Sequence, residues 1–99
     1  MYLINIELHP SAAPQAEQDE ILNQHRTWFA KHFEQGQFLI LGPFLDKARA
    51  GVIIAQAESR AELDAILATD VYYPDLAHYE IREFKAAMVA NHIQQFQSK

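Results

Sequence analysis

The chain contains no cysteine and only three glycines among its 99 residues. Without a thiol it can form no disulfide, no thiolate metal site and no cysteine nucleophile. The glycines form neither a phosphate-binding loop nor a dinucleotide-binding fingerprint, and no serine nucleophile elbow is present. These absences exclude thiol chemistry and leave no sign of a nucleotide site.

Positive charge and long apolar runs are also scarce. Eight basic residues against thirteen acidic ones give a formal net charge of −5, and the basic residues form no cluster. This charge repels phosphate backbones and anionic lipids, so we expect neither a nucleic-acid partner nor a membrane partner. No apolar run approaches the ~20 residues of a membrane span, and residues 1–7 do not resemble a signal peptide. We therefore expect a cytoplasmic protein.

The remaining composition is that of a globular domain, because 49% of the residues are hydrophobic and 11% are aromatic. The length predicts a single domain over residues 1–99, without repeats or linkers. A chain this short forms one core with a small stability margin. Dimerisation would be a natural way to bury more surface.

Hydrophobic periodicity predicts the order of the elements. Residues 2–8 alternate as a half-buried strand, with Tyr2, Ile4, Ile6 and Leu8 on one face. Residues 15–35 follow the period of a helix, and Gly36 stands where a C-cap glycine belongs. Two short apolar runs, 38–41 and 51–57, are typical of strands that form an antiparallel hairpin.

The second half of the chain repeats this pattern. Ser59 and Glu62 match a capping box, which predicts a second helix ending near Thr69 and Asp70. Residues 78–84 are predicted to form the last strand, with a possible bulge at Phe84. Residues 86–96 have the composition of a helix but only weak periodicity.

The order β-α-β-β-α-β predicts an α+β fold of the ferredoxin-like kind. In this arrangement a four-stranded antiparallel sheet carries both helices on one face. The other face also carries apolar residues, so we expect a homodimer that packs sheet against sheet.

Several short motifs in this order resemble the YciI-like (YCII-related) family, and the resemblance covers nearly the whole chain. The motifs are Gln24-His25-Arg26-Thr27-Trp28, Gly42-Pro43-Phe44-Leu45-Asp46, Gly51-Val52-Ile53-Ile54-Ala55, and Ser59-Arg60-Ala61-Glu62-Leu63 followed by Asp70. The resemblance implies a ferredoxin-like fold of the dimeric α/β-barrel type, dimers formed through the sheet, and an active site built on a His–Asp pair. It also points to a dehydrochlorinase that acts on a chlorinated hydroxyquinol without a metal.

The chain departs from the family pattern at one place. Where the family has Asp-Pro-aromatic, this sequence has Asp70-Val71-Tyr72, and its proline comes only at Pro74. The missing proline relaxes the backbone just after the second helix, which bears on the position of Asp70.

The pair that the resemblance indicates is His25 with Asp70. His25 lies in the apolar stripe of the first helix, and an imidazole can give or take a proton near neutral pH. Asp70 follows the second helix, where the helix dipole disfavours its charge by ~0.3–1 kcal/mol and a cationic partner would compensate. Both residues also have a structural interpretation: His25 as a hydrogen-bonded core histidine, and Asp70 as the cap of the following turn.

Further candidates lie near these motifs. Asp46 could assist the acid–base pair or bind a substrate hydroxyl, although a solvated loop residue is an equal alternative. Gly42 and Pro43 could contact a substrate where the strand ends, although shaping the strand exit is the preferred interpretation. Phe44, Tyr72, Tyr73 and Trp28 could line an aromatic slot; Tyr72 is the preferred pocket residue, and Trp28 is expected in the core or a dimer interface.

No metal or cofactor is expected. His25 and His32 are two helical turns apart, about 10 Å along the axis, which is too far for one ion held by bonds of ~2 Å. Two functions remain open: a small cofactor-free enzyme acting on a cyclic or carbonyl metabolite, with lyase-like or hydrolase-like chemistry, and a non-catalytic dimeric module that binds a small ligand or stabilises a partner.

Overall fold

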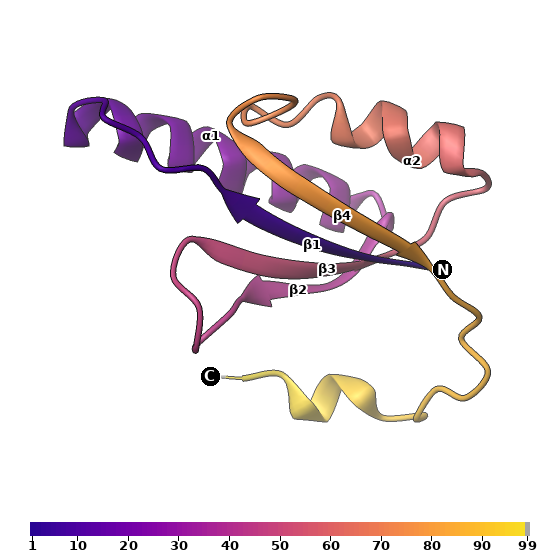
Figure 1. Cartoon of the computed structure of the whole chain (residues 1–99). Helices are drawn as coiled ribbons and strands as arrows, with labels where there is room; N and C mark the ends of the chain where they lie inside the picture. The colour runs from indigo at the N-terminus through magenta and orange to yellow at the C-terminus, as the bar shows by residue number, and fades with distance from the viewer. Residues whose placement is uncertain (99) are drawn as a thin grey trace.

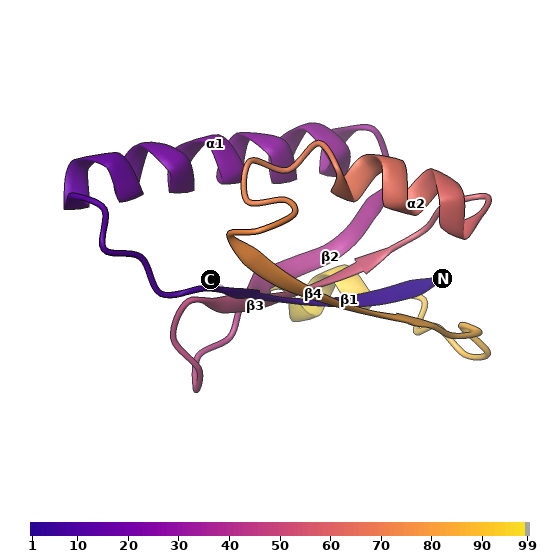
Figure 2. The same cartoon turned by 45° about the horizontal axis from the view of Figure 1, so that its top comes forward.

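A computed structural model describes residues 1–98 as a two-layer structure. Four strands form one antiparallel sheet in the order β2-β3-β1-β4, and both helices cover one face of it (Figures 1 and 2). The elements are β1 (Tyr2–Leu8), α1 (Gln15–Glu34), β2 (Phe38–Pro43), β3 (Ala50–Ala55), α2 (Arg60–Leu67), β4 (Ala77–Glu83) and a 3₁₀ turn, η1 (Ile93–Phe96). The predicted ferredoxin-like α+β fold is confirmed.

Strand β1 is central and shows the predicted alternation. Tyr2, Ile4 and Ile6 are buried beneath the helices. Ile4 lies opposite Ile53 on β3 and opposite Ile81 on β4, so the three side chains share the helix-facing side of the sheet. Apolar residues at period two thus set the register, because a shift of one residue would turn this row toward solvent.

Helix α1 ends as its sequence predicts. Gly36 follows the helix with a φ of +79°, and its N–H donates to the carbonyl of Phe33. The next N–H, of Gln37, donates to the carbonyl of His32. A residue with a Cβ is strained in this left-handed conformation, which explains the glycine.

Helix α2 begins at the predicted cap. The Ser59 hydroxyl accepts a 3.1 Å hydrogen bond from the N–H of Glu62. The Glu62 carboxylate accepts a 3.3 Å bond from the N–H of Glu58, one residue before the position that a capping box predicts. The helix ends at Leu67, and turns carry the chain from there to β4.

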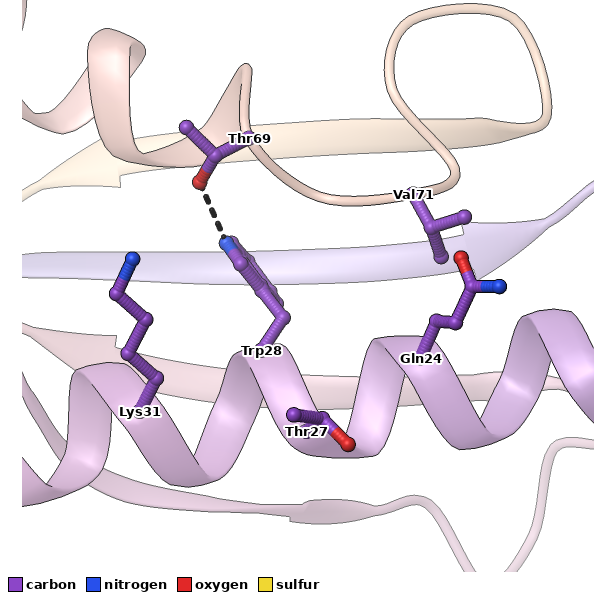
Figure 3. A pocket seen from close by; sticks show the side chains of 6 residues that line it. All are labelled: Gln24, Thr27, Trp28, Lys31, Thr69 and Val71. Atoms are coloured by element: carbon purple, nitrogen blue, oxygen red, sulfur yellow. Dashed lines mark hydrogen bonds between the residues drawn. The ribbon is translucent and has the colours of Figure 1, made fainter.

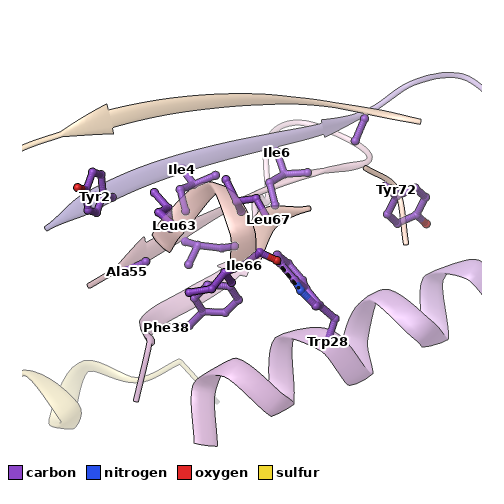
Figure 4. Packing of buried hydrophobic residues seen from close by; sticks show 12 residues of the cluster. Tyr2, Ile4, Ile6, Trp28, Phe38, Ala55, Leu63, Ile66, Leu67 and Tyr72 are labelled. Carbon is purple, nitrogen blue, oxygen red and sulfur yellow. Dashed lines mark hydrogen bonds between the residues drawn. The ribbon is translucent and has the colours of Figure 1, made fainter. Parts of the chain in front are cut away.

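The core lies between the sheet and the two helices (Figure 4). Its fully buried side chains come from every layer and are Ile4, Phe38, Ile53, Leu63 and Leu67. Burying an aliphatic or aromatic side chain contributes about 1.5–3 kcal/mol, so this small cluster supplies much of the driving force for folding.

The outer face of the sheet and the C-terminal segment differ from the core. Leu3, Val52 and Ile54 are half-buried on that face, and no helix of residues 1–98 lies over it (Figure 2). The helix predicted over residues 86–96 is wrong, because only η1 forms and it packs against none of the described strands or helices. Isolated helices of this length are marginal in water.

Two further observations complete the fold. The possible bulge at Phe84 is wrong: β4 pairs regularly to Glu83, and the one irregular register in the described sheet lies between Phe38 and Ile40. None of the helices in the described part of the chain has the length and apolar character needed to cross a membrane.

Candidate functional site

Three side chains from three elements form a continuous hydrogen-bonded chain. Nδ1 of His25 lies 2.7 Å from Oδ1 of Asp70. The hydroxyl of Tyr79 donates a 2.6 Å hydrogen bond to the other carboxylate oxygen, Oδ2. The predicted His25–Asp70 contact is therefore present, and it has a third member.

Local structure places each of these groups. His25 lies in the middle of α1, on the face that packs against the sheet. Asp70 lies in the turns after α2, where its N–H donates to the carbonyl of Leu67 and its own carbonyl accepts from the N–H of Tyr73. Tyr79 lies on β4 opposite Ile6, and so faces the helices. The site thus joins both helical segments to the sheet.

Aromatic rings enclose the imidazole. The ring of His25 lies 4.2 Å from that of Phe29 and 4.9 Å from that of Tyr72, both edge-on, and it stacks on Trp28 at 5.6 Å. The side chain of His25 keeps 7% of its surface exposed, and that of Asp70 keeps none. The pair is therefore almost wholly buried, and the small part that solvent reaches belongs to the His25 side chain.

The phenols near the pair remain protonated at neutral pH. Burial, and then the hydrogen bond to Asp70, raises the pKa of Tyr79 far above its ordinary value, and burial likewise raises the pKa of Tyr72. Because a carboxylate only accepts hydrogen bonds, both Tyr79 and Nδ1 of His25 donate to Asp70. This arrangement leaves Nε2 as the imidazole atom that can accept a proton.

A shallow hollow of about 380 Å³ adjoins the pair (Figure 3). Its lining comes from one side of α1 and from the turn around Asp70 and consists of Gln24, Thr27, Trp28, Lys31, Thr69 and Val71. The indole N–H of Trp28 donates to the Thr69 hydroxyl at 2.9 Å. Neither His25 nor Asp70 lines the hollow, but Trp28 does, and its ring also stacks on that of His25.

The structure does not bring the β2 candidates to the pair. Pro43, Gly51 on β3, Ile6 on β1 and Tyr79 on β4 form one row across the sheet. Three strand spacings separate the ends of this row, which is about 14 Å. Gly42 and Pro43 thus share an end of the sheet with Tyr79 but lie on the opposite edge.

Asp46 and Phe44 lie in the loop that follows β2. Asp46 is exposed. Phe44 lines a second hollow, of about 160 Å³, together with residues of β1 and β4 that include Glu7 and Glu80. The structure therefore brings Tyr72 into contact with the pair, together with Trp28, but not Asp46, Gly42, Pro43 or Phe44.

Tyr79 is the member of the site that sequence reasoning missed. Its alternation with Ile81 predicts that it faces the helices, and a phenol on that face requires a hydrogen-bond partner. From that requirement, a polar group opposite β4 could have been predicted. Among the described residues, no three His, Asp or Glu side chains gather as a metal site would require.

Comparisons with known proteins agree with the fold. The chain is similar to the 5-chloro-2-hydroxyhydroquinone dehydrochlorinase of Burkholderia phenoliruptrix, solved in complex with 2,5-dihydroxybenzoquinone, with 16% identity and a TM-score of 0.62 over 86% of this chain and 94% of that one. It is less similar to an antibiotic biosynthesis monooxygenase, with 18% identity and a TM-score of 0.49 over 86% of this chain and 99% of that one. No curated protein matches.

The sequence profile of one family extends over most of the chain. The YCII-related domain matches residues 1–85, which include both helices and all four strands of the sheet. The chain therefore belongs to the YCII-related domain family.

Proposed function

We propose that this protein is a small cofactor-free enzyme that uses His25 and Asp70 for general acid–base chemistry on a small cyclic or carbonyl metabolite. The observation that carries the proposal is the 2.7 Å contact between Nδ1 of His25 and a carboxylate that Tyr79 also holds. A carboxylate on Nδ1 fixes the tautomer and the orientation of an imidazole, as it does in catalytic triads.

The reaction class follows from the atoms that remain available. Nε2 of His25 accepts a proton from a carbon or hydroxyl of the substrate, while Asp70 stabilises the imidazolium that results. In an elimination, the electrons of the broken C–H bond form the new double bond and the leaving group departs with its own electron pair. No oxidant or reductant is needed, and base catalysis of this kind contributes about 10²–10⁴-fold.

The other predicted residues take secondary roles in this proposal. Tyr72 contacts the imidazole and would pack against a planar substrate. Four predicted residues lie at or after β2, on the sheet edge opposite Tyr79: Gly42, Pro43, Phe44 and Asp46. They would take part only if the substrate, or a second copy of the chain, extended from this edge to the pair. A homodimer formed through the outer sheet face and a cytoplasmic location complete the proposal.

Chloride release and ligand binding test the proposal. We expect the protein to release chloride from 5-chloro-2-hydroxyhydroquinone, and His25→Gln to lower the rate at least 100-fold. His9→Gln is the matched control, because His9 is exposed in the loop after β1. In NMR spectra, 2,5-dihydroxybenzoquinone should shift the signals of the His25 ring. The absence of both chloride release and His25 shifts would reject the enzyme.

A second function is favoured by the enclosure of the pair. Because neither His25 nor Asp70 lines the hollow of Figure 3, the protein could instead bind a small ligand there without catalysis, with the pair acting as a structural link. In that case the quinone would shift the amides of Thr69 and Val71, and His25→Gln would leave its affinity unchanged.

A further inference from the structure

Two arginine side chains from different elements lie near the phenol of Tyr72. Burial raises the pKa of this phenol, and the positive charges of Arg49 and Arg26 oppose that rise. Arg26 follows His25 on α1, Arg49 lies in the turn before β3, and both are exposed. Neither guanidinium forms an ion pair within residues 1–98, although the protein has thirteen acidic residues. Two unpaired positive charges therefore lie near the ring that contacts the imidazole.

Hydrogen bonds hold Arg49 in this position. Its guanidinium donates a 3.1 Å bond to the carbonyl of His9, and its own carbonyl accepts a 2.9 Å bond from the N–H of Leu8. The N–H of His9 donates to the carbonyl of Leu76, whose N–H in turn donates to the carbonyl of Tyr72. The loops that follow β1, β2 and α2 are thus joined, and Arg49 is linked to the turn that carries Tyr72.

The backbone of Arg49 is also unusual. Its φ is +57°, and within residues 1–98 no other residue with a side chain has a positive φ. A glycine adopts this left-handed conformation without the steric cost that a Cβ brings. Residues in such conformations cluster at ligand-binding sites, where the surrounding structure holds them in place. The presence of arginine here therefore indicates a role for its side chain.

The hydroxyl of Tyr72 is available to a ligand. Figure 4 shows Tyr72 set apart from the other labelled residues, with its hydroxyl pointing away from them. No side chain of residues 1–98 hydrogen-bonds this hydroxyl. The carboxylate of Asp70 also acts on Tyr72, but both of its oxygens are already bound, by His25 and Tyr79. The charge that this opening presents to a ligand is therefore positive.

We infer that the substrate of the proposed enzyme is a planar ring that carries negative charge, and that Arg49 and Arg26 bind this charge while the ring packs on Tyr72. The inference rests on the proposed function, because it names the substrate class of that same site. Guanidinium groups bind planar oxyanions through two parallel hydrogen bonds. A base that removes a proton from the ring adds negative charge to it, which fixed positive groups nearby stabilise.

The affinities of two quinones test this inference. 2,5-Dihydroxybenzoquinone is an anion at neutral pH, because each hydroxyl is conjugated with a carbonyl, whereas 2,5-dimethoxybenzoquinone is a neutral ring of the same kind. In calorimetric titrations the wild type should prefer the anion by about tenfold or more, and Arg49→Gln should remove this preference. Arg49→Lys keeps the charge and should keep most of the preference. Arg82→Gln is the matched control, because Arg82 is exposed on the outer face of the sheet, and should change nothing.

Arg26→Gln gives a second test that leaves the loop of Arg49 intact. This variant should also lower the preference for the anion, and thermal melts show whether each variant is folded. If Arg49→Gln does not fold, an unchanged preference in Arg26→Gln overturns the inference. A wild type without preference for the anion, or equal losses in Arg49→Gln and Arg82→Gln, would overturn it while the proposed enzyme stands. If the wild type binds neither quinone and releases no chloride, the proposed function fails and the inference fails with it.

Discussion

Tyr79 on β4 and Asp70 after α2 are joined by a 2.6 Å hydrogen bond that ties the site carboxylate to the sheet. This bond gives a physical account of the chain's departure from the family pattern. In place of a proline after the aspartate, Tyr79 and His25 hold the two carboxylate oxygens, and the backbone of Asp70 bonds within the turn on both sides. The position of Asp70 is thus fixed by its hydrogen-bond partners and not by the restricted backbone of a following proline.

Removal of the Tyr79 hydroxyl should destabilise the protein. Tyr79→Phe leaves Oδ2 of the buried Asp70 without its donor, and a hydrogen bond to a charged group contributes about 1.5–3 kcal/mol. We expect the free energy of unfolding in urea to fall by this amount. Tyr73→Phe is the control, because Tyr73 is 43% exposed and its ring packs on that of Tyr79. An equal loss in both variants would show that the buried Tyr79 hydroxyl contributes no more than the hydroxyl of the half-exposed Tyr73.

Stability should fall in alkaline solution. The ordinary tyrosine pKa is 10.0, and that of Tyr79 is raised in the folded protein by burial and by Asp70. The folded state therefore keeps a proton that the unfolded state loses above about pH 10, so this contribution is complete below that pH and declines as pH rises. Urea unfolding between pH 8 and about pH 11 should show the decline. The decline should be shallower in Tyr79→Phe, and identical slopes would contradict this assignment.

Asp70 should control the tautomer of His25. With the carboxylate present, Nδ1 carries the proton and Nε2 is free to accept one; ¹⁵N NMR of the imidazole distinguishes the two nitrogens. Asp70→Asn introduces an amide that can donate as well as accept, so the preference for the Nδ1–H tautomer should weaken and any activity should fall at least 100-fold. An unchanged tautomer with lost stability would mean that Asp70 is structural.

Two glycines at the β2–β3 pairing should respond differently to alanine. A Cβ on Gly51 would lie 2.8 Å from the carbonyl oxygen of Gly42, whereas a Cβ on Gly42 would meet nothing within 4 Å. Because the obstacle is backbone, Gly51→Ala should cost about 1–3 kcal/mol. Gly42→Ala should fold like the wild type, which makes it a suitable test of ligand approach at that strand end. Thermal melts of the two variants check this expectation.

The fold could be predicted from sequence because strong local signals agreed with each other. The alternation of Tyr2, Ile4 and Ile6, the left-handed glycine at Gly36 and the cap at Ser59 each correspond to an observed feature. The segment 86–96 could not be predicted in this way. In the structure this segment packs against none of the described strands or helices, and composition alone stabilises short helices poorly.

The site was harder to predict than the fold. The apolar stripe of α1 and the family motif together indicated His25 and Asp70, and the two side chains are in contact. Sequence order says nothing about which strand edge lies beside the pair, so Gly42 and Pro43 were grouped with it although they lie across the sheet. Tyr79 was missed because its partner, Asp70, belongs to the turn after α2. The sequence pattern of β4 gives no sign that this turn folds back onto the strand.

The central position of β1 has a consequence for how the protein is made. This strand is the first to leave the ribosome, yet both of its neighbours, β3 and β4, are synthesised later, and Tyr2 pairs with Glu83. The sheet therefore cannot close until Glu83 has been synthesised, and β1 stays without its β4 partner until then. Folding should accordingly be governed by long-range pairing, and a nascent chain stalled before β4 should be recognised by chaperones.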